Sequence, residues 1–299
     1  MFTNIFSPLQ QIAQPALRQL WVKRDDLIDP YISGNKWRKL KYVLEEAIST
    51  DKTHLVTFGG AYSNHLVATA AAAAKYALKS TAFVRGEWVD NEMLLLCKLY
   101  GMDLRFTDRD SYKDKAELYK RYFNEDDTAY FIDEGGTGRL AVKGCEEIID
   151  ELPEDIDHIF CAAGTGTTSA GLLNGIINRN RKAILHVVPV LNAGDYIKKQ
   201  ILDLTGFSVS EAPAEKLVIH QDFHFGGYAK VNEELLNFMK NFIRDTGILI
   251  DPVYTAKLFY AINSLSETNY LDKDSKIVAL HTGGLLGIFG MKAQLNRIV

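Results

Sequence analysis

Apolar, β-branched runs alternate with segments of helical periodicity along most of the chain. The run HLVTFGG (54–60) is typical of a buried strand, and the alanine-rich segment 64–78 is typical of a helix. Further strands are expected at 81–87, 103–108, 129–136, 158–164, 184–190, 216–223 and 276–284. Further helices are expected at 91–100, 112–122, 139–151, 168–178, 231–245 and 253–266. A strand followed by a helix, repeated in this way, predicts parallel sheets with right-handed crossovers.

The alternation falls into two series, which meet at the segment EGGTG (134–138). We therefore expect an α/β protein of two units, each an open, largely parallel sheet flanked by helices. The sequence contains no internal repeat, low-complexity stretch or long linker. Two such units predict a shared cleft, which is where α/β proteins bind ligands.

Composition and charge narrow the class of protein. The 299 residues are 47% hydrophobic and 24% charged, which is ordinary for a globular protein. A net charge of -4 gives no basic excess for a nucleic-acid backbone, so no nucleic-acid partner is expected. No apolar run approaches the roughly 20 residues that span a bilayer, and the start lacks the features of a signal peptide. We expect a cytoplasmic protein with no membrane partner.

The cysteine and histidine content argues against a disulfide framework or a metal site. Cys97, Cys145 and Cys161 are odd in number and form no CxxC motif, which fits a reducing compartment. His220 and His224 are four residues apart, but no cysteine or carboxylate stands in an obvious position beside them. No bound metal is expected.

A glycine-rich segment, CAAGTGTTSAG (161–171), follows an expected strand and opens an expected helix. Glycines allow the backbone to approach an anion, and the helix N-terminus adds unpaired N–H groups and a positive dipole end. No lysine completes an ATP-type loop, and Ser169 stands where a dinucleotide motif has its third glycine. The segment therefore fits a phosphate monoester better than a nucleotide; the alternative is a plain glycine-rich turn.

Two other turns have the same strand-to-helix setting. In GGAYSNH (59–65), Ser63 and Asn64 stand at the start of a helix, and HTGGLLG (281–287) again follows a strand. A serine at such a position is often only a helix cap. Because three turns with glycines and polar groups can converge on one cleft, the Ser63 turn is also a candidate site for a carboxylate.

Lys36 stands in the segment SGNKWRKL (33–40), at the start of an apparent helix. A phosphate site combined with a reactive lysine indicates pyridoxal phosphate, whose aldehyde condenses with a lysine amine. The alternative is a surface lysine. For the neighbouring Arg38, Lys39 and Lys41, we expect a solvated helix face.

The ordered motifs resemble the fold type II (tryptophan synthase β-like) pyridoxal-phosphate enzymes. They are most similar to the group of 1-aminocyclopropane-1-carboxylate (ACC) deaminases and D-cysteine desulfhydrases. The motifs are SPLQ, VKRDDL, SGNKWRKL, GGAYSNH, AAGTGTTSAG, DPVYTAK and HTGG. The resemblance implies a two-domain enzyme, with residues 1–45 and 135–299 in a large cofactor-binding domain and 46–134 in a small α/β domain. It also implies a small amino-acid substrate and a homodimer.

The resemblance implies a role for each matching position. Lys36 matches the lysine that binds the cofactor covalently, Ser63 the hydroxyl that meets the substrate carboxylate, and Asn64 the side chain near the ring oxygen. Tyr228 and Tyr254 match two active-site tyrosines. The other matches are Thr282 near the pyridine edge and the phosphate-binding residues Gly164, Thr165, Gly166, Thr167 and Thr168.

Three positions bear on the substrate. Thr255 stands where ACC deaminases have a glutamate that faces the pyridine nitrogen. A hydroxyl there supports a less charged ring and a weaker electron sink, which argues against opening the ring of ACC. His65 also matches the desulfhydrases, whereas Tyr62 replaces the glutamine usual in the group and changes the substrate pocket. D-cysteine desulfhydration, giving a 2-oxo acid, ammonia and sulfide, is therefore the expected reaction.

For the proton transfer, we expect either Lys36 or a tyrosine, with Tyr254 first among the tyrosines, to remove the substrate α-proton. A tyrosine base needs a lowered pKa, since its usual value is about 10. The enzymatic alternatives are ACC deaminase and a lyase or racemase for another D-amino acid. The other classes are a non-catalytic phosphate-ligand sensor, which would not need Lys36, and a nucleotide-dependent oxidoreductase, which would need a third glycine and a ribose-binding acid.

Overall fold

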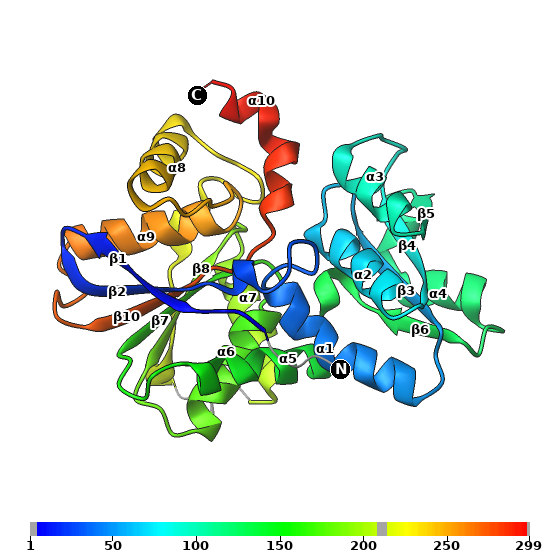
Figure 1. The fold of residues 1–299 in the computed structure, drawn as a ribbon, viewed down its shortest axis with the longest axis horizontal. Helices are drawn as coiled ribbons and strands as arrows, with labels where there is room; N and C mark the ends of the chain where they lie inside the picture. The colour runs from blue at the N-terminus through cyan, green and yellow to red at the C-terminus, as the bar shows by residue number, and fades with distance from the viewer. Residues whose placement is uncertain (1–4, 208–213, 298–299) are drawn as a thin grey trace.

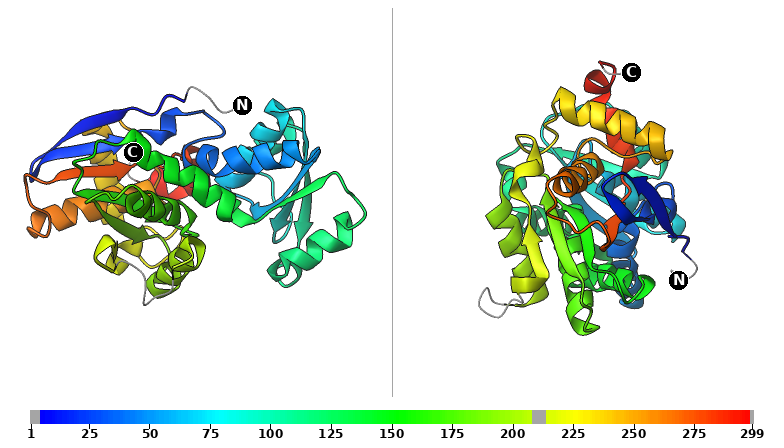
Figure 2. Two further views of the ribbon diagram at one scale, coloured as in Figure 1. Left: turned by 90° about the horizontal axis from the view of Figure 1, so that it is seen from below. Right: turned by 90° about the vertical axis from the view of Figure 1, so that its left-hand side faces the viewer.

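The computed structural model describes residues 5–207 and 214–297, which form two sheets flanked by helices (Figure 1). The six-stranded sheet has the strand order β1-β2-β10-β7-β8-β9, and the four-stranded sheet has the order β5-β4-β3-β6. Figures 1 and 2 show the two sheets in separate lobes that lie side by side along the long axis. Helix α1 (Asn35–Ser49) lies between the lobes.

The four-stranded sheet is parallel throughout. Its strands are β3 (His54–Gly60), β4 (Lys79–Arg85), β5 (Met102–Thr107) and β6 (Ala129–Ile132), and its helices are α2 (Asn64–Lys75), α3 (Glu92–Leu99) and α4 (Lys115–Phe123). The apolar run of β3 is buried because helices cover both faces of a parallel sheet. Alanines fill half of α2, and their small side chains let this helix pack close to β3 and β4.

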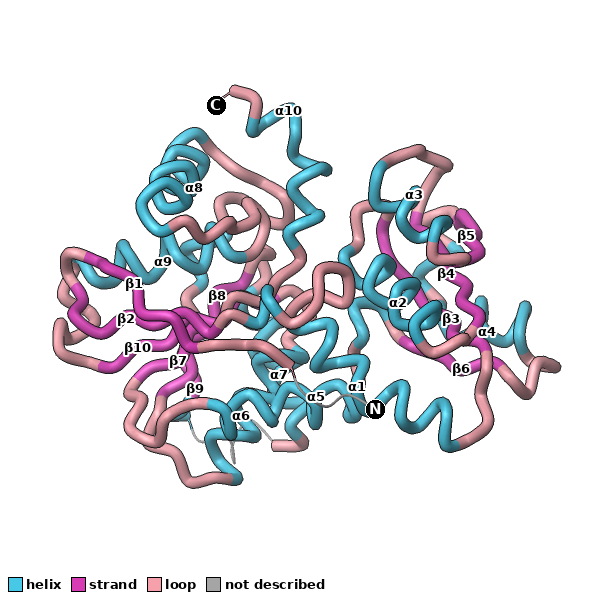
Figure 3. Tube along the Cα trace, in the orientation of Figure 1, coloured by secondary structure: helices cyan, strands magenta, loops and turns pink. Residues whose placement is uncertain are grey.

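The six-stranded sheet is parallel except for the edge strand β1, which pairs antiparallel with β2. Its strands are β1 (Leu9–Gln14), β2 (Leu17–Lys23), β7 (His158–Ala163), β8 (Ile184–Pro189), β9 (Leu217–Ile219) and β10 (Lys276–Leu280). Its helices are α5 (Arg139–Glu146), α6 (Thr167–Asn178), α7 (Gly194–Thr205), α8 (Glu233–Thr246) and α9 (Thr255–Glu267); the short helix α10 (Lys292–Leu295) follows β10. Helices lie on both faces of this sheet (Figure 3), and a separate apolar core fills each side.

Most of the strands and helices expected from the sequence pattern are confirmed. The expected strand 216–223 is wrong beyond Ile219, because residues Gln221–His224 form a 3-10 turn before Phe225 adopts a left-handed φ of 53°. The expected strand 276–284 ends at Leu280, ahead of a glycine turn. The pattern did not predict the β1–β2 hairpin or helix α7.

The expectation of a solvated basic face on α1 is wrong for two of its three residues. Arg38 is buried and binds the Asp25 carboxylate with two nitrogens, at 3.1 and 2.8 Å, and also pairs with Glu151. Lys39 is buried and donates to the carbonyl of Gly135 at 2.9 Å. These partners lie far away in the sequence, so the local pattern of α1 could not indicate them.

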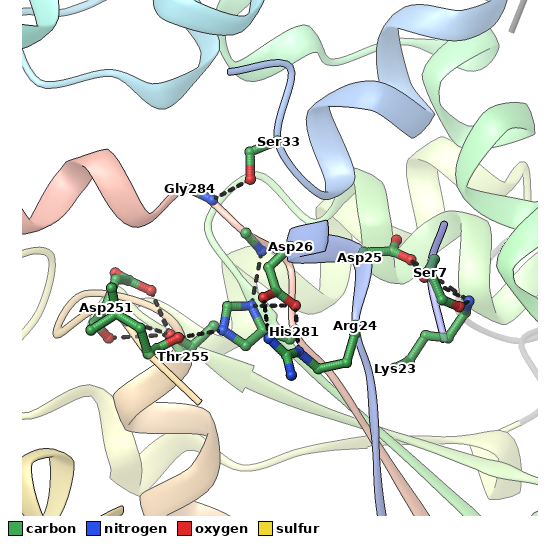
Figure 4. A network of polar contacts seen from close by, with 12 residues as sticks. Ser7, Lys23, Arg24, Asp25, Asp26, Ser33, Asp251, Thr255, His281 and Gly284 are labelled. Carbon is green, nitrogen blue, oxygen red and sulfur yellow. Dashed lines mark hydrogen bonds and ion pairs between the residues drawn. The ribbon is translucent and has the colours of Figure 1, made fainter. Parts of the chain in front are cut away.

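Arg38 belongs to a larger buried network, part of which Figure 4 shows. Lys23 pairs with Glu151 at 2.7 Å and lies 4.0 Å from Asp25, which also accepts from the Ser7 hydroxyl at 2.5 Å. Buried charges persist in proteins when they are paired and hydrogen-bonded. This network attaches the start of α1 to β2 and so fixes the helix that carries Lys36.

Three findings concern the other expectations from composition. Among the described residues, no helix is long and apolar enough to cross a membrane. The same residues contain no group of three His, Cys, Asp or Glu side chains arranged for a metal ion. Cys97, Cys145 and Cys161 are all buried free thiols, and burial raises the pKa of each.

Candidate active site

A cavity of about 530 Å³ lies at the carboxyl ends of β3, β7 and β10. The turns after these strands and the start of α1 form its walls. Of the residues that the sequence assigned to a site, the cavity is lined by Lys36, Ser63, Asn64, Gly164, Thr165, Gly166, Thr167, Thr168, Tyr228, Tyr254 and Thr282. Thr255 is the exception, and it is completely buried elsewhere. Segments from both sheets therefore converge on one site.

The position of Lys36 depends on the glycine two residues before it. Gly34 has a φ of 60°, and a Cβ added there would lie 1.9 Å from the carbonyl oxygen of Thr282. Asn35 donates its backbone N–H to the same carbonyl at 3.1 Å. The Gly284 N–H donates to the Ser33 hydroxyl at 3.3 Å, as Figure 4 shows. Only glycine permits this approach, so the Ser-Gly-Asn-Lys segment places Lys36 against the turn after β10.

The environment of Lys36 favours a neutral amine. Burial, and next the nearby Lys39 ammonium, lower the pKa of Lys36 to about 7. Burial lowers the pKa of Lys39 as well. The Lys36 Nζ donates to Asn35 Oδ1 at 2.9 Å. A lysine of this kind can act as a nucleophile near neutral pH and can also accept a proton.

The glycine-rich segment forms an anion-binding turn at the start of α6. Gly166 has a left-handed φ of 77°, and the helical hydrogen bonds begin where Ala170 donates to the Gly166 carbonyl at 2.8 Å. The N–H groups of Thr167, Thr168 and Ser169 therefore have no acceptor within the helix. These donors, together with the helix dipole, form the kind of site that binds phosphate.

The turn after β3 presents two further polar side chains. Ser63 is the N-cap residue of α2, yet its side chain makes no capping hydrogen bond. Ser63 is therefore not simply a side-chain cap of the helix. The Asn64 amide faces the turn after β10, because a Cβ added at Gly284 would lie 2.8 Å from Asn64 Nδ2. Both side chains line the cavity and are free to meet a ligand.

His65, the next residue, is a buried neutral histidine. Thr57 donates its hydroxyl proton to the Ile132 carbonyl at 2.9 Å, so at 2.7 Å it accepts from His65 Nε2–H. His65 Nδ1 is therefore an acceptor, and it is buried without a hydrogen-bond partner among the described residues. Burial and the nearby Lys36 and Lys39 hold the pKa of His65 well below its usual value.

The two tyrosines pack edge to face against each other in the cavity wall. The rings of Tyr228 and Tyr254 lie 6.2 Å apart, and a Cβ added at Gly164 would lie 3.2 Å from the Tyr254 hydroxyl. Burial, and next the neighbouring Tyr228, raise the pKa of Tyr254 well above its usual value. This is the opposite of the direction that a tyrosine base requires, so the electrostatics favour Lys36 as the proton acceptor.

Asp251 explains where Thr255 lies. Its carboxylate accepts the N–H groups at the start of α9, from Val253, Tyr254 and Thr255, each at 2.9 Å. The Thr255 hydroxyl donates to the same carboxylate at 2.8 Å. Thr255 thus takes part in capping a helix, whereas Thr282, at the turn after β10, does line the cavity.

Several cavity residues were not singled out from the sequence. They are Asn35, Lys39, Arg85, Arg109, Glu134 and Ser169. One signal was available: Arg85 and Glu134 belong to segments that were expected to be strands parallel to β3. Because parallel strands end at the same edge of a sheet, residues at those ends are candidates for the same site.

These groups fit pyridoxal phosphate. The N–H groups at the start of α6 suit its phosphate, the neutral amine of Lys36 suits its aldehyde, and the Asn64 amide makes no hydrogen bond among the described residues. The threonine hydroxyls of the turn add further donors, with Thr165 Oγ1 and Thr167 Oγ1 3.1 Å apart.

Comparisons with known proteins agree with this interpretation. The family model described as "Pyridoxal-phosphate dependent enzyme" matches residues 4–283. A putative 1-aminocyclopropane-1-carboxylate deaminase of Thermotoga maritima is 33% identical, over 97% of this chain and 96% of that protein. The bifunctional D-cysteine desulfhydrase/1-aminocyclopropane-1-carboxylate deaminase of Arabidopsis thaliana is 30% identical, over 94% of this chain and 76% of that protein.

A solved structure described as an ACC deaminase homologue has the same fold. It superposes with a TM-score of 0.85 at 28% identity, over all of this chain and 95% of the other. The fold-class expectation of two mostly parallel, helix-flanked sheets is therefore confirmed.

Proposed function

Because the chain belongs to the pyridoxal-phosphate-dependent enzyme family, we propose that it deaminates a small amino acid by β-elimination, with D-cysteine as the first substrate to test. The observation that carries this proposal is the Lys36 amine, which has a pKa of about 7 and shares one cavity with the anion-binding turn of α6. When bound, the cofactor withdraws electrons from the substrate α-carbon and so makes its C–H bond acidic.

We assign the cofactor mainly to the larger lobe and to α1. The division into a large domain of residues 1–45 and 135–299 and a small domain of residues 46–134 stays a prediction. Lys36 would bind the aldehyde, and the turn Gly164–Thr168 would bind the phosphate. Thr282 and Asn64 would meet the ring edge and its oxygen. Thr255 would support the ring only through Asp251 and Tyr254, since its hydroxyl is engaged in the cap of α9.

The substrate carboxylate would bind at the turn before α2. The Ser63 hydroxyl makes no capping bond, and the N-terminus of α2 favours a negative charge. Lys36, once released by the substrate amine, would accept the α-proton. Tyr254 would remain a protonated donor near the cofactor, because its pKa is raised.

With D-cysteine, the β-carbon would lose its thiol group together with the C–S bonding electrons. One water is consumed overall, and the products are pyruvate, ammonia and hydrogen sulfide. The homodimer and the cytoplasmic location expected from the sequence stay predictions.

ACC deamination is the second candidate, and one observation favours it. The argument against ACC depended on a hydroxyl at Thr255 facing the pyridine nitrogen, but Thr255 is buried outside the cavity lining. Its position therefore no longer argues against ring opening. The names of the Thermotoga and Arabidopsis relatives support the same candidate.

The test is the release of 2-oxo acid by the purified holoenzyme, with D-cysteine, L-cysteine and ACC supplied in parallel. Sulfide is measured in the same samples, and the Lys36→Ala variant is the control. Release of pyruvate and sulfide from D-cysteine supports the first candidate, and release of 2-oxobutyrate from ACC supports the second. Turnover by Lys36→Ala near the wild-type rate would contradict the assignment of this lysine.

A further inference from the structure

A second hollow adjoins the active-site cavity on the side of the four-stranded sheet. It has a volume of about 410 Å³ and is lined by Arg85, Arg109, Tyr112, Lys113, Lys115 and Glu134. We call it the basic recess. Arg85, Arg109 and Glu134 also line the main cavity, so the two spaces share a wall. Nothing in the proposed binding of cofactor and substrate carboxylate uses these residues.

The sheet brings the two arginines together. Arg85 is the last residue of β4 and pairs with Thr107, the last residue of β5, and Arg109 follows two residues later. A Cβ added at Gly60 would lie 3.7 Å from an Arg85 guanidinium nitrogen. Arg85 therefore stands beside the turn that carries Ser63, at the edge where parallel strands bind ligands.

The positive charges of the recess are only partly compensated. Lys113 pairs with Asp110 at 2.8 Å, and Lys115 lies 3.5 Å from Glu134 and 3.7 Å from Asp133. Arg85 reaches Glu134 only at 3.9 Å, and about half of its side chain is exposed.

Arg109 is the unpaired cation of the recess. It is exposed and makes no hydrogen bond or ion pair with any described residue. An arginine guanidinium is well suited to binding a planar or tetrahedral anion with two hydrogen bonds.

Tyr112 also lines the recess, and its ring packs beneath Arg85. Its side chain is 3% exposed, and its hydroxyl is buried without a hydrogen-bond partner among the described residues. The Arg85 guanidinium lies 5.6 Å from the centre of the Tyr112 ring. Burial and the Glu134 carboxylate raise the pKa of this phenol, so it keeps its proton. This hydroxyl is buried and lies beside Glu134, so the groups of the recess that an anion can reach are its cations.

We propose that the basic recess binds an anionic group on the β-substituent of the substrate, so that the preferred substrate is a small amino acid with a second negative charge. This inference rests on the proposed β-elimination. D-cysteine and ACC carry no such group and would leave Arg109 without a partner. An amino acid whose leaving group is a phosphate or a carboxylate-bearing thiol would pair with Arg109.

The reaction balances with O-phosphoserine as the probe. Lys36 accepts the α-proton, and phosphate leaves the β-carbon with the C–O bonding electrons. Uptake of one water then gives pyruvate, ammonium and inorganic phosphate. O-acetylserine is the matched neutral probe, because it also has an activated oxygen leaving group at the β-carbon.

The experiment compares these two probes, each as the D- and the L-enantiomer, with D-cysteine as the reference, on the wild-type holoenzyme and the Arg109→Ala variant. We expect kcat/KM of the wild type to be higher for O-phosphoserine than for O-acetylserine of the same enantiomer. In Arg109→Ala, that ratio should fall about tenfold or more, the loss expected from one charge-assisted hydrogen bond. The control Arg121→Ala, on the exposed face of α4 outside the recess, should change neither value.

Three outcomes would contradict the proposal or separate it from the proposed function. Equal or lower kcat/KM for O-phosphoserine in the wild type would overturn it. An equal fall for all substrates, D-cysteine included, would show that Arg109 only attracts anions in general. If no probe yields 2-oxo acid, the proposed reaction fails, and calorimetric titration with O-phosphoserine tests the anion site by itself. Binding that is weaker in Arg109→Ala than in the wild type would support the site. Absence of binding would overturn it.

Discussion

Asn35 joins Lys36, the proposed catalytic lysine, to the anion-binding turn. Its Nδ2 donates to Thr168 Oγ1 at 3.0 Å, and its Oδ1 accepts from the Lys36 amine at 2.9 Å. One side chain at the start of α1 thereby connects Lys36 and Thr168, which are 132 residues apart in the sequence. Asn35 is therefore a positioning residue for both Lys36 and the turn.

Replacing Asn35 should weaken cofactor binding and slow turnover. We expect Asn35→Ala to bind pyridoxal phosphate about fivefold to tenfold more weakly, because a net hydrogen bond contributes on the order of 1 kcal/mol. Titration of the cofactor-free protein with pyridoxal phosphate, followed by absorbance, measures this change. A lower kcat with an unchanged KM for the substrate would show that Lys36 has moved from its position. Asn178→Ala, at the far end of α6, removes an exposed bond to Glu146 and is the control. Equal cofactor affinity in Asn35→Ala and the wild type would show that Asn35 does not position Lys36 and the turn.

Lys36 should destabilise the cofactor-free protein. Its pKa is about 7 in the folded state and about 10.5 when unfolded, so the unfolded state binds more protons between these values. The cost of keeping the amine neutral is therefore absent above pH 10.5, grows as the pH falls, and is complete near pH 7. We expect cofactor-free Lys36→Met to have a higher free energy of unfolding than the wild type at pH 7, by on the order of a few kcal/mol.

Urea unfolding of both proteins at pH 7 and pH 10 measures this difference. The gap should narrow at the higher pH. Lys198→Met, at an exposed position of α7, is the matched control. A variant that is less stable than the wild type at pH 7 would show that Lys36 is not held as a desolvated amine.

Asp251 should matter for both stability and catalysis. It accepts three backbone N–H groups at the start of α9, including that of Tyr254. We expect Asp251→Ala to lower the free energy of unfolding by about 1–3 kcal/mol and also to lower kcat, because Tyr254 loses its anchor. Asn232→Ala removes the cap of α8, where Asn232 accepts from Leu235 N at 2.9 Å, outside the cavity lining. If both variants lose stability and neither loses kcat, Tyr254 does not depend on Asp251.

The turns of the site were accessible from the sequence because they depend on local signals. Glycines after an apolar run, followed by a helical segment, indicate a strand-to-helix turn, and parallel strands bring such turns to one edge. Gly34 could also be recognised from its own segment, Ser-Gly-Asn-Lys, although its contact with Thr282 is long-range. The same logic placed Ser63 and the turn Gly164–Thr168 in one cavity.

The remaining features depend on partners that a single segment does not reveal. Arg38 resembles a solvated residue on α1 and is buried because Asp25 and Glu151 surround it. Thr255 follows Tyr254, which lines the cavity, and yet does not line the cavity itself, because its hydroxyl donates to Asp251 in the helix cap. Arg109 lies in a loop whose direction is set by the pairing of β5 with β4. In each case tertiary contacts, absent from the local pattern, decide the outcome.

Three histidines from neighbouring strands form a hydrogen-bonded row outside the active site. His158 Nδ1 lies 3.0 Å from His186 Nε2, and His186 Nδ1 lies 2.8 Å from His220 Nε2. The ring of Phe160 stacks on that of His186 at 4.4 Å. His220 therefore belongs to this row rather than to a pair with His224.

The row should make the fold sensitive to acid. Burial, and next the neighbouring His220, lower the pKa of His186 to about 3, while burial lowers that of His220 to about 4 against the opposing charge of Asp222. Burial also lowers the pKa of His158, beside Asp157 and Lys182. Unfolded histidines titrate near pH 6.5, so the unfolded state binds more protons as the pH falls below that value.

The stability contributed by neutral histidines is therefore fully present above about pH 6.5 and is lost as the pH falls toward 4. We expect the free energy of unfolding to decrease over this window in the wild type, and to decrease less in His186→Phe, which keeps the stack on Phe160 but cannot take up a proton. Urea unfolding at pH 7, 6, 5 and 4 measures both slopes. Identical slopes, or imidazole NMR signals of His186 that titrate near pH 6.5 in the folded protein, would show that the row is not held neutral by the fold.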